Sequence, residues 1–189
     1  SAGYHSVSEV EDGKVVHGGL DFKGVSKKEG GVTMTAEEFK KVLHNGETDT
    51  VEFKSWVNAR NQKEIISLAV DELIAFANCK GGTVYFGVED RPVEVTGCDR
   101  DYDGQRILEG IYDKTRPSLF AEIEDFEYEG KVVIAISVKS DGKTYTTTDG
   151  RCLKRLGKNS KPLYPDELSN VYSSIQTPDF SGRIINEST

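Results

Sequence analysis

The chain has 189 residues, of which 36% are hydrophobic and 30% charged, and its formal net charge at pH 7 is −8. This composition suits one globular domain with polar ends and excludes a disordered chain. An acidic balance argues against general nucleic-acid binding, because the phosphate backbone favours basic surfaces, so only a local basic patch would support that function.

The three cysteines, Cys79, Cys98 and Cys152, are odd in number and show no Cys-x-x-Cys spacing. A disulfide framework or a zinc knuckle is therefore not expected, and a reducing intracellular compartment, the cytoplasm, is. The sequence has no run of about 18 apolar residues, which predicts no contact with a membrane interior, and no signal peptide is visible.

The first elements alternate between helix and strand. Residues 1–33 are rich in glycine and predict a flexible N-terminal arm or a short edge hairpin. Thr35 and Glu38 form a capping-box pattern that begins a helix, and Gly46 ends it. Residues 50–55 alternate apolar with charged side chains, which predicts a strand.

Next comes the main core helix, predicted from a cap at Asn61 to about Asn78 because two adjacent apolar rows run along it. Residues 83–88 then predict a central strand, and residues 104–116 another amphipathic helix. The glycines 81–82 lie after a helix and before a strand, the reverse of a phosphate-binding loop, so tight packing is the expected role.

From Phe120 onward the pattern predicts strands. Two of them meet at residues 129–130, and Asp149-Gly150 predicts a hairpin between residues 143–148 and 151–156. A last helix begins at Pro165, with a buried stripe expected at Leu168, Val171, Tyr172 and Ile175.

This element order predicts a mixed α/β (α+β) fold, in which a mixed β-sheet is flanked by helices. We expect one domain over residues 34–176, between the arm at 1–33 and an extended C-terminal tail at 177–189.

Acidic side chains gather around the first predicted strand. Glu52 and Lys54 share one face of it, Glu47 precedes it, and Asp90, or alternatively Glu89, ends a strand expected beside it. Three carboxylates at strand ends form a hard oxygen cluster that suits Mg²⁺ or Mn²⁺, and Lys54 would neutralise charge on a phosphoryl group. The alternative reading is a solvated strand face with a cross-strand pair.

A basic cluster lies further along the chain, on the last predicted strand and the loop after it. It offers charge, amides and side-chain donors for a nucleic-acid backbone, or else charge that keeps an edge strand soluble. Its candidate binding residues are Arg151, Lys154, Arg155, Lys158, Asn159 and Lys161. Three aromatic residues, Trp56, Tyr102 and Tyr145, are candidate base-stacking platforms, although Trp56 is more typical of the core margin.

Several motifs together resemble the Schlafen AlbA-type domain, also called a divergent AAA domain. They are residues 50–54 (Thr-Val-Glu-Phe-Lys), residues 75–83, residues 87–90 (Gly-Val-Glu-Asp) and Gly97, followed by residues 155–159, which resemble an Arg-Val-Gly-Ser-x motif. Residues 178–181 are similar to a segment that often follows this domain in bacterial members.

The resemblance implies an α/β domain that binds nucleic acid. In animal Schlafens this domain carries a Glu/Glu/Asp endoribonuclease centre that cuts structured RNA such as tRNA with a divalent ion, and Glu47, Glu52 and Asp90 match its spacing. Prokaryotic members are described as transcriptional regulators, often labelled ATP-binding, so a non-catalytic DNA-binding domain of a regulator, or an ATP-binding domain, is the alternative.

Two departures from the animal proteins bear on these expectations. The animal proteins have a zinc site built from cysteine and histidine. This sequence contains no matching cluster of these residues, so zinc is not expected. Those proteins also pair two related lobes, and one lobe alone would need a homodimer to rebuild the clamp.

Overall fold

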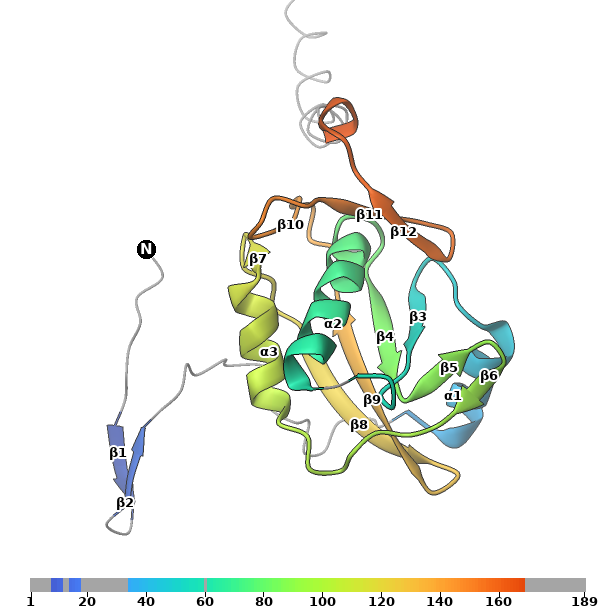
Figure 1. Ribbon diagram of the computed structural model, residues 1–189, viewed down its shortest axis with the longest axis vertical. Helices are drawn as coiled ribbons and strands as arrows, with labels where there is room; N and C mark the ends of the chain where they lie inside the picture. The colour runs from blue at the N-terminus through green and yellow to red at the C-terminus, as the bar shows by residue number, and fades with distance from the viewer. Residues whose placement is uncertain (1–7, 12–13, 18–33, 60, 169–189) are drawn as a thin grey trace, which may run out of the picture.

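The computed structural model describes residues 8–11, 14–17, 34–59 and 61–168. Its centre is a four-stranded mixed sheet in the order β3-β4-β9-β8 (Figure 1). β3 runs parallel to β4, and β9 is antiparallel to both β4 and β8. These strands span Val51–Lys54 (β3), Gly82–Phe86 (β4), Glu122–Tyr128 (β8) and Lys131–Val138 (β9).

Helices cover both faces of this sheet. α2 (Gln62–Ala77) and α3 (Gly104–Asp113) lie together on one face, and α1 (Ala36–Asn45) contributes to a separate core on the other (Figure 1). Successive side chains of β4 divide between the two cores, because strand residues alternate in direction. Val84 and Phe86 join the α2 and α3 core, while Tyr85 joins the α1 core. The predicted mixed α/β fold is confirmed.

Local capping signals begin the helices as the sequence predicts. The Thr35 hydroxyl accepts from the Glu38 amide while the Glu38 carboxylate accepts from the Thr35 amide, so the capping box is complete. Asn61 caps α2 in a similar way through the Glu64 amide. Phe39 anchors α1 to the sheet, with its ring 4.8 Å from the ring of Phe126.

Gly82 brings the end of α2 close to the sheet. A Cβ at this position would lie 2.7 Å from both the Phe76 ring and the Thr50 carbonyl oxygen, so only glycine allows the approach. The predicted packing role of the glycine pair is therefore confirmed. Gly87, at φ +91°, interrupts the predicted strand 83–88, which continues as the separate β5.

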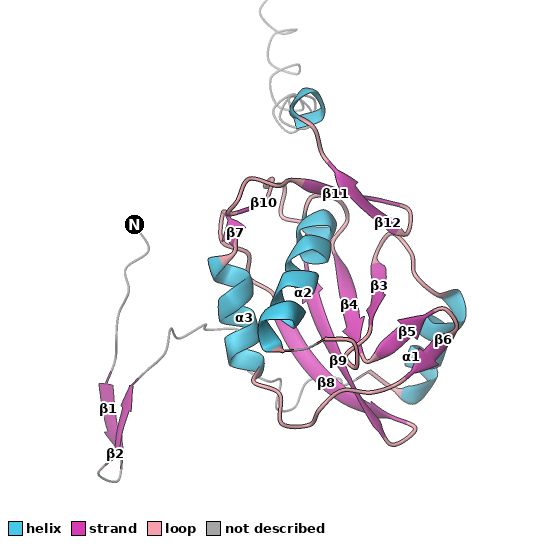
Figure 2. Ribbon diagram, in the orientation of Figure 1, coloured by secondary structure: helices cyan, strands magenta, loops and turns pink. Residues whose placement is uncertain are grey.

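In the described part of the chain, four further strand pairs lie outside the central sheet, three of them within the domain (Figure 2). β5 (Val88–Asp90) pairs with β6 (Val93–Val95), and β7 (Thr115–Arg116) pairs with β10 (Thr146–Thr147). β11 (Leu153–Leu156) and β12 (Asn159–Pro162) form a hairpin beside the end of α2, and β1 (Ser8–Glu11) pairs with β2 (Lys14–His17).

The predicted hairpin across Asp149-Gly150 is wrong. A turn exists there, closed by a 2.8 Å bond from the Thr147 amide to the Arg151 carbonyl, but β11 takes β12 as its partner. The reason lies in Asn78. Its side chain forms hydrogen bonds with the amide and carbonyl of Tyr145 and with the carbonyl of Leu153, so these groups are not available to pair the two segments as strands.

The helix predicted at Pro165 begins there and is described as far as residue 168. Val171, Tyr172, Ile175 and the tail at 177–189 lie outside the described residues, as does most of the arm at 1–33. Among the described helices, none combines the length and the apolar character that crossing a membrane requires.

Candidate functional site

Glu52 and Lys54 share one face of β3, as predicted, but this face is not solvated. Glu52 is only 6% exposed, and the Lys54 Nζ lies 2.7 Å from its Oε1. The same ammonium lies 3.1 Å from Oε1 of Glu72 on α2. The alternative prediction of a solvated face with a cross-strand pair is therefore wrong. The structure has an ion-pair network between β3 and α2 instead.

Arg155, from β11, completes this network by pairing with the second oxygen of each carboxylate. Its Nη2 lies 2.8 Å from Glu52 Oε2 and its Nη1 lies 3.0 Å from Glu72 Oε2, so each carboxylate is shared by two cations. The guanidinium also donates to the carbonyl oxygens of Thr48 and Val51 and stands 4.8 Å from the centre of the Phe76 ring. Its side chain is 1% exposed.

Glu72 and Ser160 are members of the network that sequence reasoning missed. Ser160 on β12 accepts from Arg155 Nη1 at 3.1 Å and donates to the Glu72 carboxylate. A signal for Glu72 was present in the sequence, since residues 71–72 are charged within an otherwise almost apolar stretch of α2. A charged side chain among core residues needs a partner, but which partner depends on tertiary structure.

Lys54 keeps its charge in this setting. Burial alone would lower the pKa of its ammonium, but the hydrogen bond to Glu52 and the negative charges of Glu72 and Glu52 outweigh burial and raise that pKa. Lys54 therefore stays positively charged at neutral pH.

Glu47 lies beside the network, and no ion pair joins it to another residue of the described part of the chain. Its Oε1 accepts from the Phe53 amide at 3.2 Å. Partial burial raises the pKa of its carboxyl group, and the nearby charges of Glu52 and Asp90 raise it further. Glu47 is thus close enough to both Glu52 and Asp90 to feel their charges.

These three acids do not form a ligand set for a metal ion in the described structure. Both oxygens of Glu52 pair with cations, and Asp90 Oδ2 lies 3.2 Å from Nε of Arg91. The alternative residue Glu89 accepts from the Thr96 hydroxyl at 3.3 Å. Over residues 34–59 and 61–168, no three or more His, Cys, Asp or Glu side chains are grouped so that they could share an ion. The Mg²⁺ or Mn²⁺ site stays a prediction that this arrangement does not fit.

The predicted basic cluster divides into internal and exposed members. Arg155 is buried, so its predicted contact with phosphate is corrected to a structural role. Arg151 pairs with Asp71 at 2.9 Å and Asp149 at 3.5 Å, and Lys154 pairs with Glu167. Lys158, Asn159 and Lys161 are exposed, the first two at the turn of the β11–β12 hairpin and the third further along β12.

Of the three aromatic candidates, Tyr145 is buried, with its hydroxyl 2.7 Å from Asp141 Oδ2. Trp56 packs at the margin of the α2 and α3 core, edge-on to Phe86 and to Tyr102. The core-margin reading of Trp56 is therefore confirmed.

The class of this domain is now defined. It is an α/β domain in which an exposed lysine hairpin lies beside an internal network of two glutamates, a lysine and an arginine. The family model for the domain described as Schlafen, AlbA_2 matches residues 47–164. Because this match covers more than half of the chain, the chain belongs to the Schlafen AlbA_2 family. Membership of this family indicates a nucleic-acid-related function.

The solved structures that are similar to this chain include the following two. The DIP2311 protein from Corynebacterium diphtheriae matches with a TM-score of 0.54 and 21% identity, over 66% of this chain and 29% of that one. The N-terminal domain of an ATP-dependent DNA helicase RecG-related protein from Nitrosomonas europaea matches with a TM-score of 0.46 and 18% identity, over 70% of this chain and 95% of that one. The first supports the fold alone, and the second is too distant to support an argument. The region similar to the DIP2311 protein spans less than a third of that protein.

Proposed function

We propose that this chain binds nucleic acid and that backbone phosphates contact the β11–β12 hairpin. The observation that carries the proposal is that Lys158 and Lys161 are exposed on this hairpin and form no ion pair with any acidic residue of the described part of the chain. Asn159 adds an exposed amide between them. In a chain of net charge −8, cations without acidic partners are the groups best suited to phosphate.

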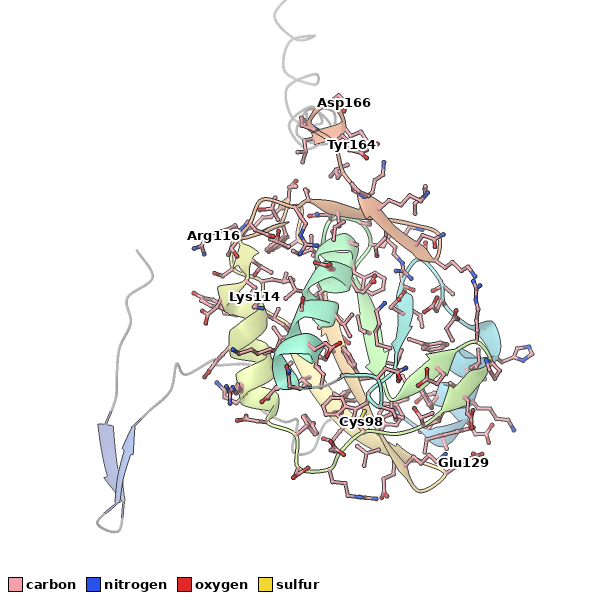
Figure 3. The ribbon with its side chains drawn as sticks, viewed as in Figure 1. Cys98, Lys114, Arg116, Glu129, Tyr164 and Asp166 are labelled. Carbon is pink, nitrogen blue, oxygen red and sulfur yellow. The ribbon has the colours of Figure 1, made fainter. Side chains whose placement is uncertain are left out.

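The internal network supports this proposal by fixing the hairpin in place. Arg155 holds β11 and Ser160 holds β12 to the same carboxylate, that of Glu72. A rigid hairpin presents its lysines with little loss of conformational freedom on binding. Just beyond β12, Tyr164 is 61% exposed and offers a ring on which a base can stack (Figure 3).

Removing the two exposed charges is expected to weaken binding to nucleic acid of any sequence. For the double variant Lys158→Gln with Lys161→Gln, the slope of log affinity against log salt should fall by about one for each lysine that contacts a phosphate. Fluorescence anisotropy with labelled RNA and DNA hairpins, between about 50 and 200 mM salt, measures both quantities and compares the two nucleic acids.

The matched control for this test is Lys40→Gln with Lys41→Gln. These two lysines are exposed on α1, which lies on the other face of the sheet, and the control removes the same charge. An equal loss of affinity in both double variants would mean that the hairpin has no special role. Affinity that does not change with salt would contradict phosphate contact altogether.

A second candidate function is cleavage of structured RNA, and the proximity of Glu47 to the charges of Glu52 and Asp90 favours it. Incubation of the protein with tRNA and Mn²⁺ tests it. If the activity is real, Glu47→Gln should abolish cutting and leave tRNA affinity within about twofold, because Gln keeps an acceptor for the Phe53 amide and removes only the charge. Cutting that persists in Glu47→Gln, or no cutting by either protein, would reject this candidate.

A further inference from the structure

A pocket of about 510 Å³ lies beyond the end of β3, and no residue of the acidic network lines it. Its walls come from the turn after β3, from the segment that follows β6, and from the turn between β8 and β9. Cys98 and Glu129, both labelled in Figure 3, mark the region. The volume falls in the range of sites that hold small organic molecules. The lining residues used below are Trp56, Asp99, Arg100 and Lys131.

Trp56 gives this pocket an aromatic wall that is already fixed in position. Its ring is held edge-on by Phe86 and Tyr102, each at 6.3 Å between ring centres. Its indole nitrogen donates to Asp99 Oδ2 at 3.0 Å, so the polar end of the ring is satisfied. Because the indole is held by these contacts, a ligand that stacks on it pays little for ordering the side chain.

Two cations stand among the lining residues, and neither is committed to a buried partner. Lys131 is exposed and its ammonium donates to the Val95 carbonyl at 2.9 Å. Arg100 pairs with Glu127, but the two side chains are 66% and 59% exposed. An exposed pair of this kind contributes little to stability, so a phosphate oxygen can replace the Glu127 carboxylate at small cost.

A fixed indole with two available cations matches one ligand chemistry, a flat heteroaromatic ring that carries a phosphate. We propose that this pocket takes an unpaired nucleobase of a bound nucleic-acid strand, with the base against Trp56 and its phosphate near Lys131 and Arg100. The proposal rests on the proposed function and deepens it. Trp56 follows Lys54 by two residues and packs on the same α2 side of the sheet.

Trp56 is the single tryptophan of the chain, so its intrinsic fluorescence reports on this pocket directly. A short single-stranded oligonucleotide and a nucleoside monophosphate are both expected to quench it, whereas ribose 5-phosphate, which lacks the base, is not. Lys131→Gln keeps the fluorophore and should weaken quenching by both base-containing ligands. Equal quenching by ribose 5-phosphate, or no quenching by either base-containing ligand, would overturn the proposal.

Affinity measured by anisotropy with a labelled oligonucleotide separates this proposal from the hairpin. Trp56→Leu should lower that affinity by about 5- to 150-fold, the range for losing one stacked base. In the hairpin variant Lys158→Gln with Lys161→Gln, the monophosphate should still quench Trp56 fluorescence. Oligonucleotide binding without any change in Trp56 fluorescence would reject the pocket and leave the hairpin proposal standing. Monophosphate quenching without oligonucleotide binding would reject the hairpin and redefine the ligand as a free nucleotide.

Discussion

Replacing Arg155 with methionine is expected to lower the free energy of unfolding by about 3–5 kcal/mol, the usual cost of removing one partner from a buried ion pair. The variant leaves Glu52 and Glu72, whose side chains are 8% and 13% exposed, with Lys54 as their remaining cation. It also removes the donors to the carbonyl oxygens of Thr48 and Val51. Urea denaturation followed by circular dichroism measures the loss.

Two further variants separate the geometry of Arg155 from its charge. Arg155→Lys keeps the charge but loses the planar fork that reaches Glu52, Glu72 and the backbone together, so it should recover only part of the stability. Arg106→Met, at an exposed position on α3, should change stability by no more than about 0.5 kcal/mol. A loss below about 1 kcal/mol in Arg155→Met would show that the network is not the source of stability.

The helices of this domain were predictable because their signals are local. The Thr35 capping box, the Asn61 cap and the apolar rows of α2 all act within a few residues, and the predicted boundaries of α1 and α2 agree with the structure to within one or two residues. The strand ends at residues 129–130 were predictable for the same reason, since a two-residue turn sets the pairing of β8 with β9. The helix predicted over residues 104–116 ends three residues early, at Asp113, because Thr115 and Arg116 pair as β7 with β10.

The acidic centre was only half predictable from sequence. Glu52 and Lys54 could be placed on one face because strand periodicity is local, but their partners could not. Arg155 reaches Glu72 across 83 residues of chain, a separation that no periodic pattern encodes. The sequence therefore indicated an acidic catalytic cluster and a separate basic surface, whereas the structure joins Arg155 to the acids and leaves Lys158 and Lys161 of that surface exposed for a ligand.

The ion pairs of Arg155 with Glu52 and Glu72 change the electrostatics of the acidic centre. Lys54 and Arg155 already neutralise the two buried acids, so the centre resembles a structural support more than a site prepared for a cation. Glu47 is the exception among the residues described, since burial and the neighbouring acids Glu52 and Asp90 raise the pKa of its carboxyl group and no cation pairs with it.

The second large effect is expected at Asn78, which links the end of α2 to the loops that lead into β11. Its side-chain nitrogen donates to the carbonyl oxygens of Tyr145 and Leu153 at 2.9 and 2.8 Å, and its side-chain oxygen accepts from the Tyr145 amide at 2.7 Å. Asn78→Ala removes the side-chain partner of the Tyr145 amide and the Leu153 carbonyl, and it leaves the buried Tyr145 carbonyl with only the weak Cys152 thiol donor at 3.4 Å. At about 1–3 kcal/mol for each of the two groups that lose their partner, the expected loss is roughly 2–3 kcal/mol or more.

The same variant should also affect the hairpin, because Leu153 opens β11 and β11 carries Arg155 into the network. Hydrogen exchange is therefore expected to speed up in β10 and β11 of Asn78→Ala while the β8 and β9 amides keep their protection relative to global unfolding. Asn58→Ala, at an exposed position in the turn after β3, is the matched control and should change stability by no more than about 0.5 kcal/mol. If Asn78→Ala were as mild as Asn58→Ala, water would be replacing the amide in these contacts, and the wrong strand partner predicted for β11 would need another cause.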